Sequence, residues 1–410
     1  MASDERQWPA MTPQEAARWQ AVTAFARAHA HDDVRQLALQ ADRYPDVDLP
    51  CALDQIAARR IAATKLPLWA DNPNLIFPPR LSMEQCSSQV TAMYKAALVS
   101  GDSLVDLTGG FGVDFAFMAS RCKSATYVEI QPALCAIVHH NCEVLGLTHA
   151  RVINDDGTRY LETMEPADTI YIDPARRDKA GNRVFRLADC TPDVTALAPA
   201  MLARARRVII KLSPMLDVSQ AVASLPSVAQ VHILSVAGEC KELLLVLEPG
   251  HSGATMVHCV NDGDDFTYEF GASAPSPALW DGTPGAPLYL YEPNASLMKA
   301  GCHALLAERY GVLLAGRDSH LCVSQQRVPD FPGREFVIDA VTTLNKRDLK
   351  AALAGITHAN VAVRNFPLSA LALAQRLRLR DGGDTYIFGT TVSPTPAAKP
   401  SHVLLICHKP

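Results

Sequence analysis

The sequence lacks the features of a membrane-spanning or secreted protein. No apolar run approaches the roughly 18 residues that a transmembrane helix needs. Residues 1–19 (MASDERQWPAMTPQEAARW) contain acidic residues and no apolar core, which argues against a secretory signal. The 11 cysteines are odd in number and form no CxxC pair, which disfavours a zinc site and a disulfide framework and favours reduced thiols. These absences predict a cytoplasmic protein that binds neither a membrane nor a metal.

An excess of one charge is also missing. The 410 residues carry 38 Lys and Arg against 43 Asp and Glu, a formal net charge of −5, so any surface for nucleic acid must be local. Hydrophobic residues make up 48% of the chain and charged residues 20%, which excludes wholesale disorder. At roughly 150 residues per domain, this length predicts two or three domains.

Two patterns divide the first part of the chain. Residues 1–80 are predicted to be helical, because apolar residues recur at helical spacing without strand-like alternation. Beyond residue 84, short apolar strands alternate with helices, which predicts the α/β class with a mostly parallel, doubly wound sheet. The predicted strands are 103–107, 125–130, 150–154, 169–173, 207–212, 229–235 and 243–247. The short link between the last two predicts an antiparallel hairpin at the sheet edge.

A second, smaller pattern follows. Residues 250–285 are rich in Gly, Pro, Ser and Asp, which is typical of a connector or a β-hairpin appendage. Beyond residue 287 we expect strands 288–291, 320–324, 335–340, 360–363, 385–391 and 402–408, and helices 296–310, 346–354 and 367–377.

A glycine cluster follows the first of the predicted strands. Residues 105–114 (VDLTGGFGVD) place Asp106 at the strand end and Gly109, Gly110 and Gly112 in the turn after it. Glycines let the backbone turn sharply and approach a ligand closely. The spacing is not GxGxxG, and a carboxylate ahead of the glycines suits a cationic amino group better than a pyrophosphate. The pattern favours S-adenosylmethionine (SAM) over a dinucleotide, with a tight structural turn as the alternative.

Two further acidic strand ends strengthen this interpretation. Glu129 closes the next strand, 23 residues after Asp106, where a carboxylate can accept both hydroxyls of a ribose. A solvated carboxylate is the alternative for Glu129. Asp155 and Asp156 follow the third strand, where they can meet an adenine edge, although Asx-Gly pairs are also ordinary turn formers. Because parallel strands end at one edge of a sheet, these side chains are predicted to line one ligand site.

The fourth strand ends in Asp173-Pro174, and here a family resemblance becomes specific. Residues 106–114, Glu129, Asp156 and Asp173-Pro174 together resemble motifs I to IV of class I SAM-dependent methyltransferases. Further segments are similar to a bacterial subfamily of these enzymes with a C-terminal THUMP-like domain. They are residues 81–88, 172–176, 211–217, 238–242, 291–294 and 331–334.

The resemblance implies a Rossmann-like methyltransferase sheet with a helical N-terminal layer and a smaller C-terminal α+β unit. The implied domains are a helical region (1–80), the methyltransferase domain (81–250), a connector (251–285), a ferredoxin-like unit (286–334) and a THUMP-like domain (335–410). The implied cofactor-binding residues are Gln85, Ser87, Asp106, Thr108, Gly109, Gly110, Gly112, Asp114, Glu129, Asp155 and Asp156. Gln85 and Ser87 would donate to the methionine carboxylate, with a helix cap as the alternative.

The implied catalytic residues are Asp173, Pro174 and Arg176, with Asp173 orienting or deprotonating a nucleophile. Exocyclic-amine methyltransferases tend to have an aromatic residue where this chain has Arg176, so adenine N6 chemistry is not favoured. The DPAR run is closer to the DPPR of RNA 5-methyluridine methyltransferases. Those enzymes use a cysteine after the fifth strand, where this chain has Leu212-Ser213-Pro214, so a covalent C5 mechanism is disfavoured.

Charged residues within apolar strands form a further set, which consists of Lys211, Glu239, Lys241 and Glu242. Buried charges are costly unless they are paired, which predicts an internal ion pair such as Lys211 with a glutamate. A catalytic role for these residues is the alternative.

Residues 341–380 contain seven basic residues and one acidic residue, a local net charge of +6. THUMP domains bind RNA, so the resemblance favours an RNA-binding surface here over a solvated helix surface. The predicted RNA-binding residues are Lys346, Arg347, Arg376, Arg378 and Arg380. We therefore expect a SAM-dependent methyltransferase of structured RNA, with tRNA as one candidate. The alternatives are a small-molecule or protein methyltransferase, or a catalytically inactive SAM-binding RNA adaptor.

Overall fold

The structure is a computed structural model, and it describes residues 8–9, 11–175, 187–274, 276–283, 287–393 and 399–410. The chain forms two compact units, one of residues 1–232 with 242–256 and one of residues 233–241 with 257–410. Within the described residues, no helix is both long and apolar enough to cross a membrane.

Helices form the N-terminal part of the first unit, as the sequence predicts for residues 1–80. They are α1 (Pro13–Ala28), α2 (Val34–Ala38), α3 (Leu49–Lys65), α4 (Pro67–Ala70), α5 (Arg80–Gln85) and α6 (Gln89–Leu98), with a 3-10 turn at Ala41–Arg43. Thr12, Asp33 and Asp48 cap α1, α2 and α3, because each side chain accepts a hydrogen bond from a backbone N–H of the first turn.

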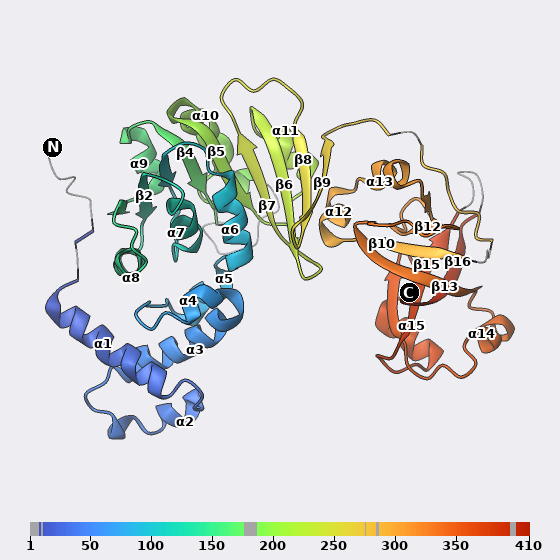
Figure 1. The fold of residues 1–410 in the computed structure, drawn as a ribbon, viewed down its shortest axis with the longest axis horizontal. Coiled ribbons are helices and arrows are strands. Elements are labelled where there is room, and N and C mark those ends of the chain that lie inside the picture. The colour runs from blue at the N-terminus through green and yellow to red at the C-terminus, as the bar shows by residue number, and fades with distance from the viewer. Residues whose placement is uncertain (1–7, 10, 176–186, 275, 284–286, 394–398) are drawn as a thin grey trace. The chain divides into compact units, whose positions relative to one another are not determined.

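The first sheet has the strand order β3-β2-β1-β4-β5-β7-β6-β8-β9 (Figure 1). Its strands are β1 (Ser103–Asp106), β2 (Ser124–Glu129), β3 (Ala150–Asn154), β4 (Ala167–Ile172), β5 (Ala205–Leu212), β6 (Val228–Val236), β7 (Glu239–Leu247), β8 (Met256–Asn261) and β9 (Asp264–Glu269). The strands β1 to β5 pair in parallel, whereas β7 pairs antiparallel with β5. The carboxyl ends of β1 to β4 therefore meet at one edge, as predicted.

Helices cover both faces of the parallel part of this sheet. They are α7 (Val113–Ala119), α8 (Pro132–Val144), α9 (Gly157–Thr163) and α10 (Val194–Arg204), and a short helix α11 (Val218–Ala223) follows β5. Figure 1 shows α6, α7 and α8 on one face and α9 and α10 on the other; α6 packs against α7, and α9 against α10. This arrangement confirms the predicted doubly wound α/β architecture.

The sheet departs from the prediction at the β6–β7 hairpin. Ala237 and Gly238, with φ of 52° and 76°, form its two-residue turn. The hairpin does not form the sheet edge, because β8 and β9 continue the sheet beyond β6. These two strands come from the segment 250–285, for which the hairpin alternative is the observed one. Asp262 and Gly263, also with positive φ, form the turn between them.

Two buried amide side chains attach the helical layer to the sheet domain. Gln55 of α3 is 1% exposed; it donates to the carbonyl of Phe77 (2.5 Å) and accepts from the Phe77 N–H (3.0 Å). Asn141 of α8 is 3% exposed and makes the same pair of bonds with Ile76 (2.8 and 2.9 Å). The segment between α4 and α5 is therefore held from both sides, and Trp69 packs beside it against Phe111 after β1.

The second unit contains a separate sheet with the order β11-β12-β10-β13-β16-β15-β14. Its strands are β10 (Tyr289–Pro293), β11 (Leu313–Leu314), β12 (Cys322–Ser324), β13 (Gly333–Thr342), β14 (Asn360–Arg364), β15 (Thr385–Val392) and β16 (Ser401–His408). Its helices are α12 (Ala295–Ala300), α13 (His303–Tyr310), α14 (Lys346–Ala352) and α15 (Ala370–Leu377). The single helix predicted for 296–310 is wrong: Gly301 adopts a left-handed conformation (φ 68°) and ends α12.

The hydrogen bonds of the buried amides are expected to stabilise the protein. Asn141→Leu removes the partner of both backbone groups of Ile76 and leaves them buried without hydrogen bonds. We expect a loss of about 2–5 kcal/mol in the free energy of unfolding, measured by urea denaturation. Gln20→Leu, at an exposed position of α1, is the matched control and should change little. Equal unfolding midpoints for the two variants would show that the amide does not carry this attachment.

Candidate cofactor and active site

The loop after β1 contains three glycines, and a different structural feature accounts for each of them. A Cβ on Gly109 would lie 2.0 Å from the ring of Tyr127, so packing alone excludes a side chain there. Gly112 has φ of 77° and is the N-cap residue of α7. Gly110 has φ of 54°, and a Cβ there would meet only the Thr108 carbonyl, at 3.9 Å. The loop therefore presents open space at Gly110, as the predicted approach of a ligand requires.

Asp106 provides a buried carboxylate beside this loop. It is 1% exposed and accepts a hydrogen bond from the Thr108 N–H at 2.9 Å. Among the described residues no Lys, Arg or His forms an ion pair with it. Burial, together with the nearby carboxylates of Asp114, Asp173 and Glu129, raises its pKa well above the ordinary value. A ligand that brings a positive charge to this carboxylate would relieve this penalty.

Glu129 ends β2 on the other side of the glycine loop. Its two carboxylate oxygens accept hydrogen bonds from the backbone N–H groups of Gly110 and Gln131, each at 2.9 Å. The side chain is fixed by these bonds, and each carboxylate oxygen retains a lone pair for another donor. Vicinal hydroxyls of a ribose are donors of the required kind.

The acidic pair after β3 has mainly local contacts. Asp156 caps α9 by accepting from the Thr158 N–H at 2.7 Å, so the turn-forming alternative describes it well. Asp155 is buried; its carboxylate accepts from the Asp156 N–H and forms an ion pair with Arg159 at 3.1 Å. Asp155 is linked directly to the candidate ligand site, because its backbone N–H donates a hydrogen bond to the Glu129 carbonyl.

The residues around the loop fit SAM better than a dinucleotide. Carboxylates with no cationic partner among the described residues suit an ammonium group, and the fixed Glu129 suits a ribose. The same carboxylates would repel a pyrophosphate. Groups of three or more His, Cys, Asp or Glu that could hold a metal ion are absent from the described part of the chain.

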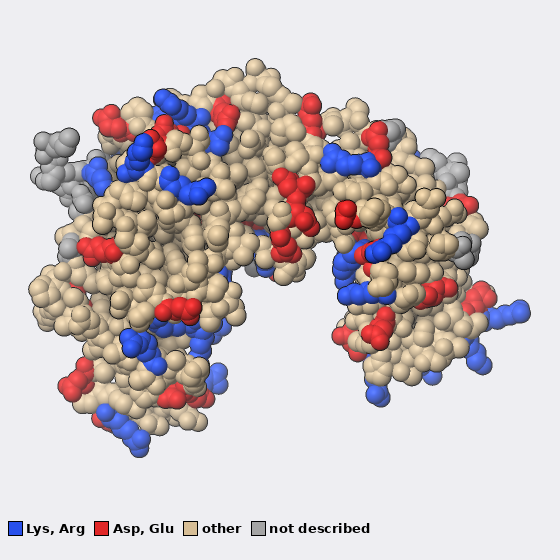
Figure 2. Space-filling model, viewed as in Figure 1, with Lys and Arg blue, Asp and Glu red and all other residues tan. Residues whose placement is uncertain are grey.

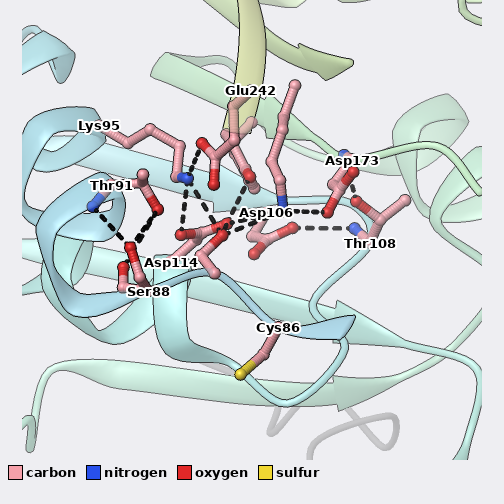
Figure 3. Close-up of polar contacts among 12 residues, drawn as sticks. Cys86, Ser88, Thr91, Lys95, Asp106, Thr108, Asp114, Asp173 and Glu242 are labelled. Atoms are coloured by element: carbon pink, nitrogen blue, oxygen red, sulfur yellow. Dashed lines mark hydrogen bonds and ion pairs between the residues drawn. The ribbon is translucent and has the colours of Figure 1, made fainter. Parts of the chain in front are cut away.

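Asp173, directly after β4, reaches the same edge of the sheet. Its N–H donates to the Thr108 hydroxyl at 2.6 Å, and its carboxylate accepts from Lys211 of β5 at 2.7 Å. Pro174 is buried behind it. Arg176, the third predicted catalytic residue, lies outside the described residues. The structure thus brings Asp106, Thr108 and Asp173 together, as Figure 3 shows.

A line of five alternating charges, here termed the charge chain, runs from β7 to Asp173. Its members are Glu242, Lys95, Asp114, Lys211 and Asp173. Lys95 contacts both Glu242 and Asp114 (3.1 Å to Asp114), as Figure 3 shows. Lys211 contacts Asp114 at 3.5 Å and Asp173 at 2.7 Å. The predicted ion pair of Lys211 with a glutamate is therefore wrong in its partner: Glu242 pairs with Lys95 instead.

Two hydroxyl groups complete the charge chain. Ser87 donates to Asp114 at 2.8 Å and accepts from Lys95 and Lys211 at 3.1 and 3.0 Å. Tyr171 of β4 donates to Asp114 at 2.7 Å. The only hydroxyl hydrogen of Ser87 is thus engaged within the protein, which does not support its predicted bond to a methionine carboxylate. Gln85, at the end of α5, is exposed, and Ser88, three residues later, caps α6.

The charges in this chain reinforce one another. Burial opposes ionisation of Asp114, but Lys95, Lys211 and the hydroxyls of Tyr171 and Ser87 hold its pKa below the ordinary value. Burial alone would lower the pKa of Lys211, but the carboxylates of Asp173, Asp114 and Glu242 raise it well above the ordinary value. Both groups therefore stay ionised at neutral pH.

Lys95 lies in the candidate site but was not predicted from the sequence. It is 0% exposed, on the face of α6 that also carries the buried residues Thr91, Ala92 and Ala96. A lysine at this spacing on an apolar helix face was the signal available in the sequence. Lys241, by contrast, forms a separate and largely exposed pair with Glu239.

The predicted RNA-binding residues are exposed in the second unit. Lys346 and Arg347 begin α14, Arg376 lies in the last turn of α15, and Arg378 and Arg380 follow it. Figure 2 shows Lys and Arg side chains near these two helices, interspersed with Asp and Glu. Arg364, another basic residue of this region, forms an ion pair with the buried Glu292, which also pairs with Arg334.

Family comparisons match the C-terminal part of the chain. Residues 289–332 match a family described as a ferredoxin-like domain, and residues 333–409 match one described as THUMP domain-like. These matches agree with the resemblance from which the same two kinds of unit were predicted.

Comparisons with whole proteins cover the rest. A crystal structure of a Porphyromonas gingivalis W83 protein assigned as a methyltransferase is 30% identical with a TM-score of 0.80, over 98% of this chain and 100% of that one. A SAM-dependent methyltransferase of Mycobacterium tuberculosis (strain H37Rv) is 25% identical over 88% of this chain and 97% of its own length. A ribosomal RNA small subunit methyltransferase J from Hydrogenovibrio crunogenus is 29% identical over 27% of this chain and 47% of its own. The chain therefore belongs to the family of SAM-dependent methyltransferases that carry ferredoxin-like and THUMP-like domains at their C-terminal end.

Proposed function

We propose that this methyltransferase modifies structured RNA, such as tRNA or ribosomal RNA. The observation that carries the proposal is the presence, on one chain, of a carboxylate-lined cofactor site and a THUMP-like segment with exposed basic residues. Arg376, Arg378 and Arg380 form no ion pair among the described residues, so they are available to phosphates. The ribosomal RNA methyltransferase among the relatives gives independent support for RNA.

The proposal assigns a role to each strand end. SAM supplies an electrophilic methyl group on a sulfonium sulfur. Asp106 would hold the ammonium group of the cofactor, Glu129 the ribose hydroxyls and Asp155 the adenine edge. Gly110 would leave room for the ligand, and Asp173 would face the group that receives the methyl.

The proposal also places the protein in a reducing compartment, the cytoplasm. All 11 cysteines are free thiols, and seven of them are buried. Burial raises the pKa of Cys142 to about 12 and that of Cys322 to about 12, so these thiols are unreactive structural residues.

The cofactor assignment predicts the effects of two substitutions. Asp106→Asn should weaken SAM binding at least about tenfold, because the charge that pairs with the ammonium group is lost. Gly110→Val should abolish binding, because its side chain would occupy the open space beside the loop. Calorimetric titration with SAM measures both effects.

A matched control separates this effect from backbone strain. Gly146, beyond the end of α8, also has positive φ (72°), and a Cβ there would meet no atom within 4 Å. Gly146→Val therefore carries a similar conformational penalty away from the site and should bind SAM like the parent. Unchanged SAM affinity in a folded Gly110→Val protein would remove this loop from the cofactor site.

The assignment of Asp173 predicts a separation of binding from chemistry. Asp173→Asn keeps the shape of the side chain but cannot accept a proton as a carboxylate does. We expect SAM affinity within a few fold of the parent and a turnover lower by on the order of 10²-fold or more, measured with a saturating RNA substrate. Equal losses of affinity and turnover would make Asp173 a scaffold residue of the cofactor site.

Labelled-methyl transfer tests RNA as the substrate. Total RNA from a strain that lacks the protein should accept label from SAM, and nucleoside mass spectrometry should then identify one modified nucleoside. Replacing Arg376, Arg378 and Arg380 by Glu should raise the KM for RNA and reduce its salt dependence, because fewer counterions are released on binding. SAM affinity should not change.

A charge-matched variant controls for net charge. Arg27, Arg35 and Arg43 are exposed on the N-terminal helical layer, so replacing them by Glu changes the net charge by the same amount. At matched ionic strength, this variant should methylate RNA like the parent. Equal KM values for both triple variants would show that the segment after α15 is a solvated surface. A failure of any RNA to accept label would favour a small-molecule or protein substrate.

A further inference from the structure

The charge chain opens to the surroundings at one end only. The side chains of Lys95 and Glu242 are 0% and 7% exposed, those of Asp114 and Lys211 are 10% and 13% exposed, and that of Asp173 is 38% exposed. From Lys95 onward, side-chain exposure therefore rises along the charge chain toward Asp173, the residue at the candidate reacting position. Lys211 is the last buried link before that residue.

This gradient is not what a purely structural ion pair requires. Burying charges costs several kcal/mol per ion before pairing, and apolar side chains of similar volume often replace such pairs without loss of stability. Glu242, Lys95 and Asp114 carry two negative charges and one positive charge. Lys211 adds a second cation, which lies closer to the partly exposed carboxylate of Asp173 (2.7 Å) than to that of Asp114 (3.5 Å). Lys211 is therefore expected to act on Asp173.

We propose that Lys211 is a positioning residue that acts through Asp173, holding its carboxylate ionised and aimed so that it accepts the proton of an N–H or O–H nucleophile during methyl transfer. This inference rests on the proposed function and deepens it, because it names the chemical class of the acceptor atom. The contact of 2.7 Å, together with the Thr108 hydroxyl bond to the Asp173 N–H, fixes both ends of residue 173.

The proton and electron balance of the step follows from this assignment. The lone pair of the acceptor nitrogen or oxygen forms the new bond to the methyl carbon, and the bond between sulfur and methyl breaks. The electron pair of that bond stays on sulfur, which becomes a neutral thioether. The acceptor atom loses its hydrogen as a proton to an oxygen of Asp173, and the proton then passes to water.

A carbon acceptor that needs a cysteine nucleophile would require a thiolate beside Asp173. The close-up shows the thiol of Cys86 (Figure 3), which donates to the Met83 carbonyl at 3.3 Å. Burial raises its pKa, so it is not a thiolate at neutral pH. The residues drawn in the close-up therefore include a carboxylate base and no thiolate, which suits an acceptor that already carries its own lone pair.

The sign of the expected pH effect follows from the surroundings of Asp173. Desolvation raises the pKa of this carboxyl, and the Lys211 ammonium group opposes that rise. The charged and titratable groups that face the pair from the neighbouring elements are Lys95, Asp106, Asp114, Tyr171, Glu242 and the thiol of Cys86. Most of these are acidic, so removal of the Lys211 charge leaves Asp173 among carboxylates and raises its pKa. As the pH falls, Asp173 of the variant is then protonated at a higher pH than Asp173 of the parent. Activity is lost at that higher pH as well.

The test compares Lys211→Met and Lys211→Arg in the full-length protein. In Lys211→Met the acidic limb of the kcat profile should move up by about one pH unit or more, the usual effect of losing one close opposite charge. In Lys211→Arg it should stay near that of the parent. SAM affinity should be unchanged in both variants, because Asp106 and Glu129 remain.

A second readout does not depend on turnover or on the identity of the RNA. Protein labelled with ¹³C in the Asp carboxyl groups gives the titration of Asp173 by NMR, with Asp173→Asn identifying its resonance. The midpoint should rise in Lys211→Met and not in Lys211→Arg. If Lys211→Met does not fold, Lys211→Gln takes its place, because it keeps a hydrogen-bond donor and loses the charge.

Parent-like titration and a parent-like acidic limb in the folded Met or Gln variant would overturn the inference and leave Lys211 as a structural ion pair. A shifted titration in a protein that methylates no RNA would contradict the proposed substrate, while it would support the coupling of Lys211 to Asp173. The two failures are therefore distinguishable.

Discussion

Asp114 lies between two lysine ammonium groups, and the arrangement of the site depends on this buried contact. Lys95 reaches it from α6 and Lys211 from β5, while Tyr171 reaches it from β4. The Asp114 carboxylate, on α7, therefore connects α6 to the strands β4 and β5, which end at the candidate site. Its removal would take away one of the two carboxylate partners of each lysine and leave Lys95 with Glu242 and Lys211 with Asp173.

The carboxylates at this edge of the sheet fall into two groups with different electrostatic surroundings. On one side, Asp106 and Glu129 lack a described cation and provide the negative surroundings that suit a cationic cofactor. On the other side, Lys211 neutralises part of the charge around Asp173. The carboxylate that would hold the cofactor and the carboxylate that would accept a proton are thus given different electrostatic surroundings by the same fold.

Much of this arrangement could be predicted from the sequence, because it depends on local patterns. Alternating strands and helices predicted the parallel sheet, and the acidic residues at strand ends had to meet at one edge. The missed features depend on contacts between distant residues. Nothing local to Lys211 shows that Asp173, 38 residues earlier, is its partner, or that Lys95 takes Glu242. At Gly301 the signal was local but was overlooked. This glycine marks a helix end, but the apolar pattern around it continues at helical spacing.

The position of the reacting sulfur tests the central claim most directly. A crystal structure of the protein with S-adenosylhomocysteine, the product of methyl transfer, would locate it. The account predicts the ammonium group on Asp106, the ribose on Glu129 and the sulfur facing Asp173. A ligand bound with its sulfur directed away from Asp173, or bound at another edge of the sheet, would contradict the account.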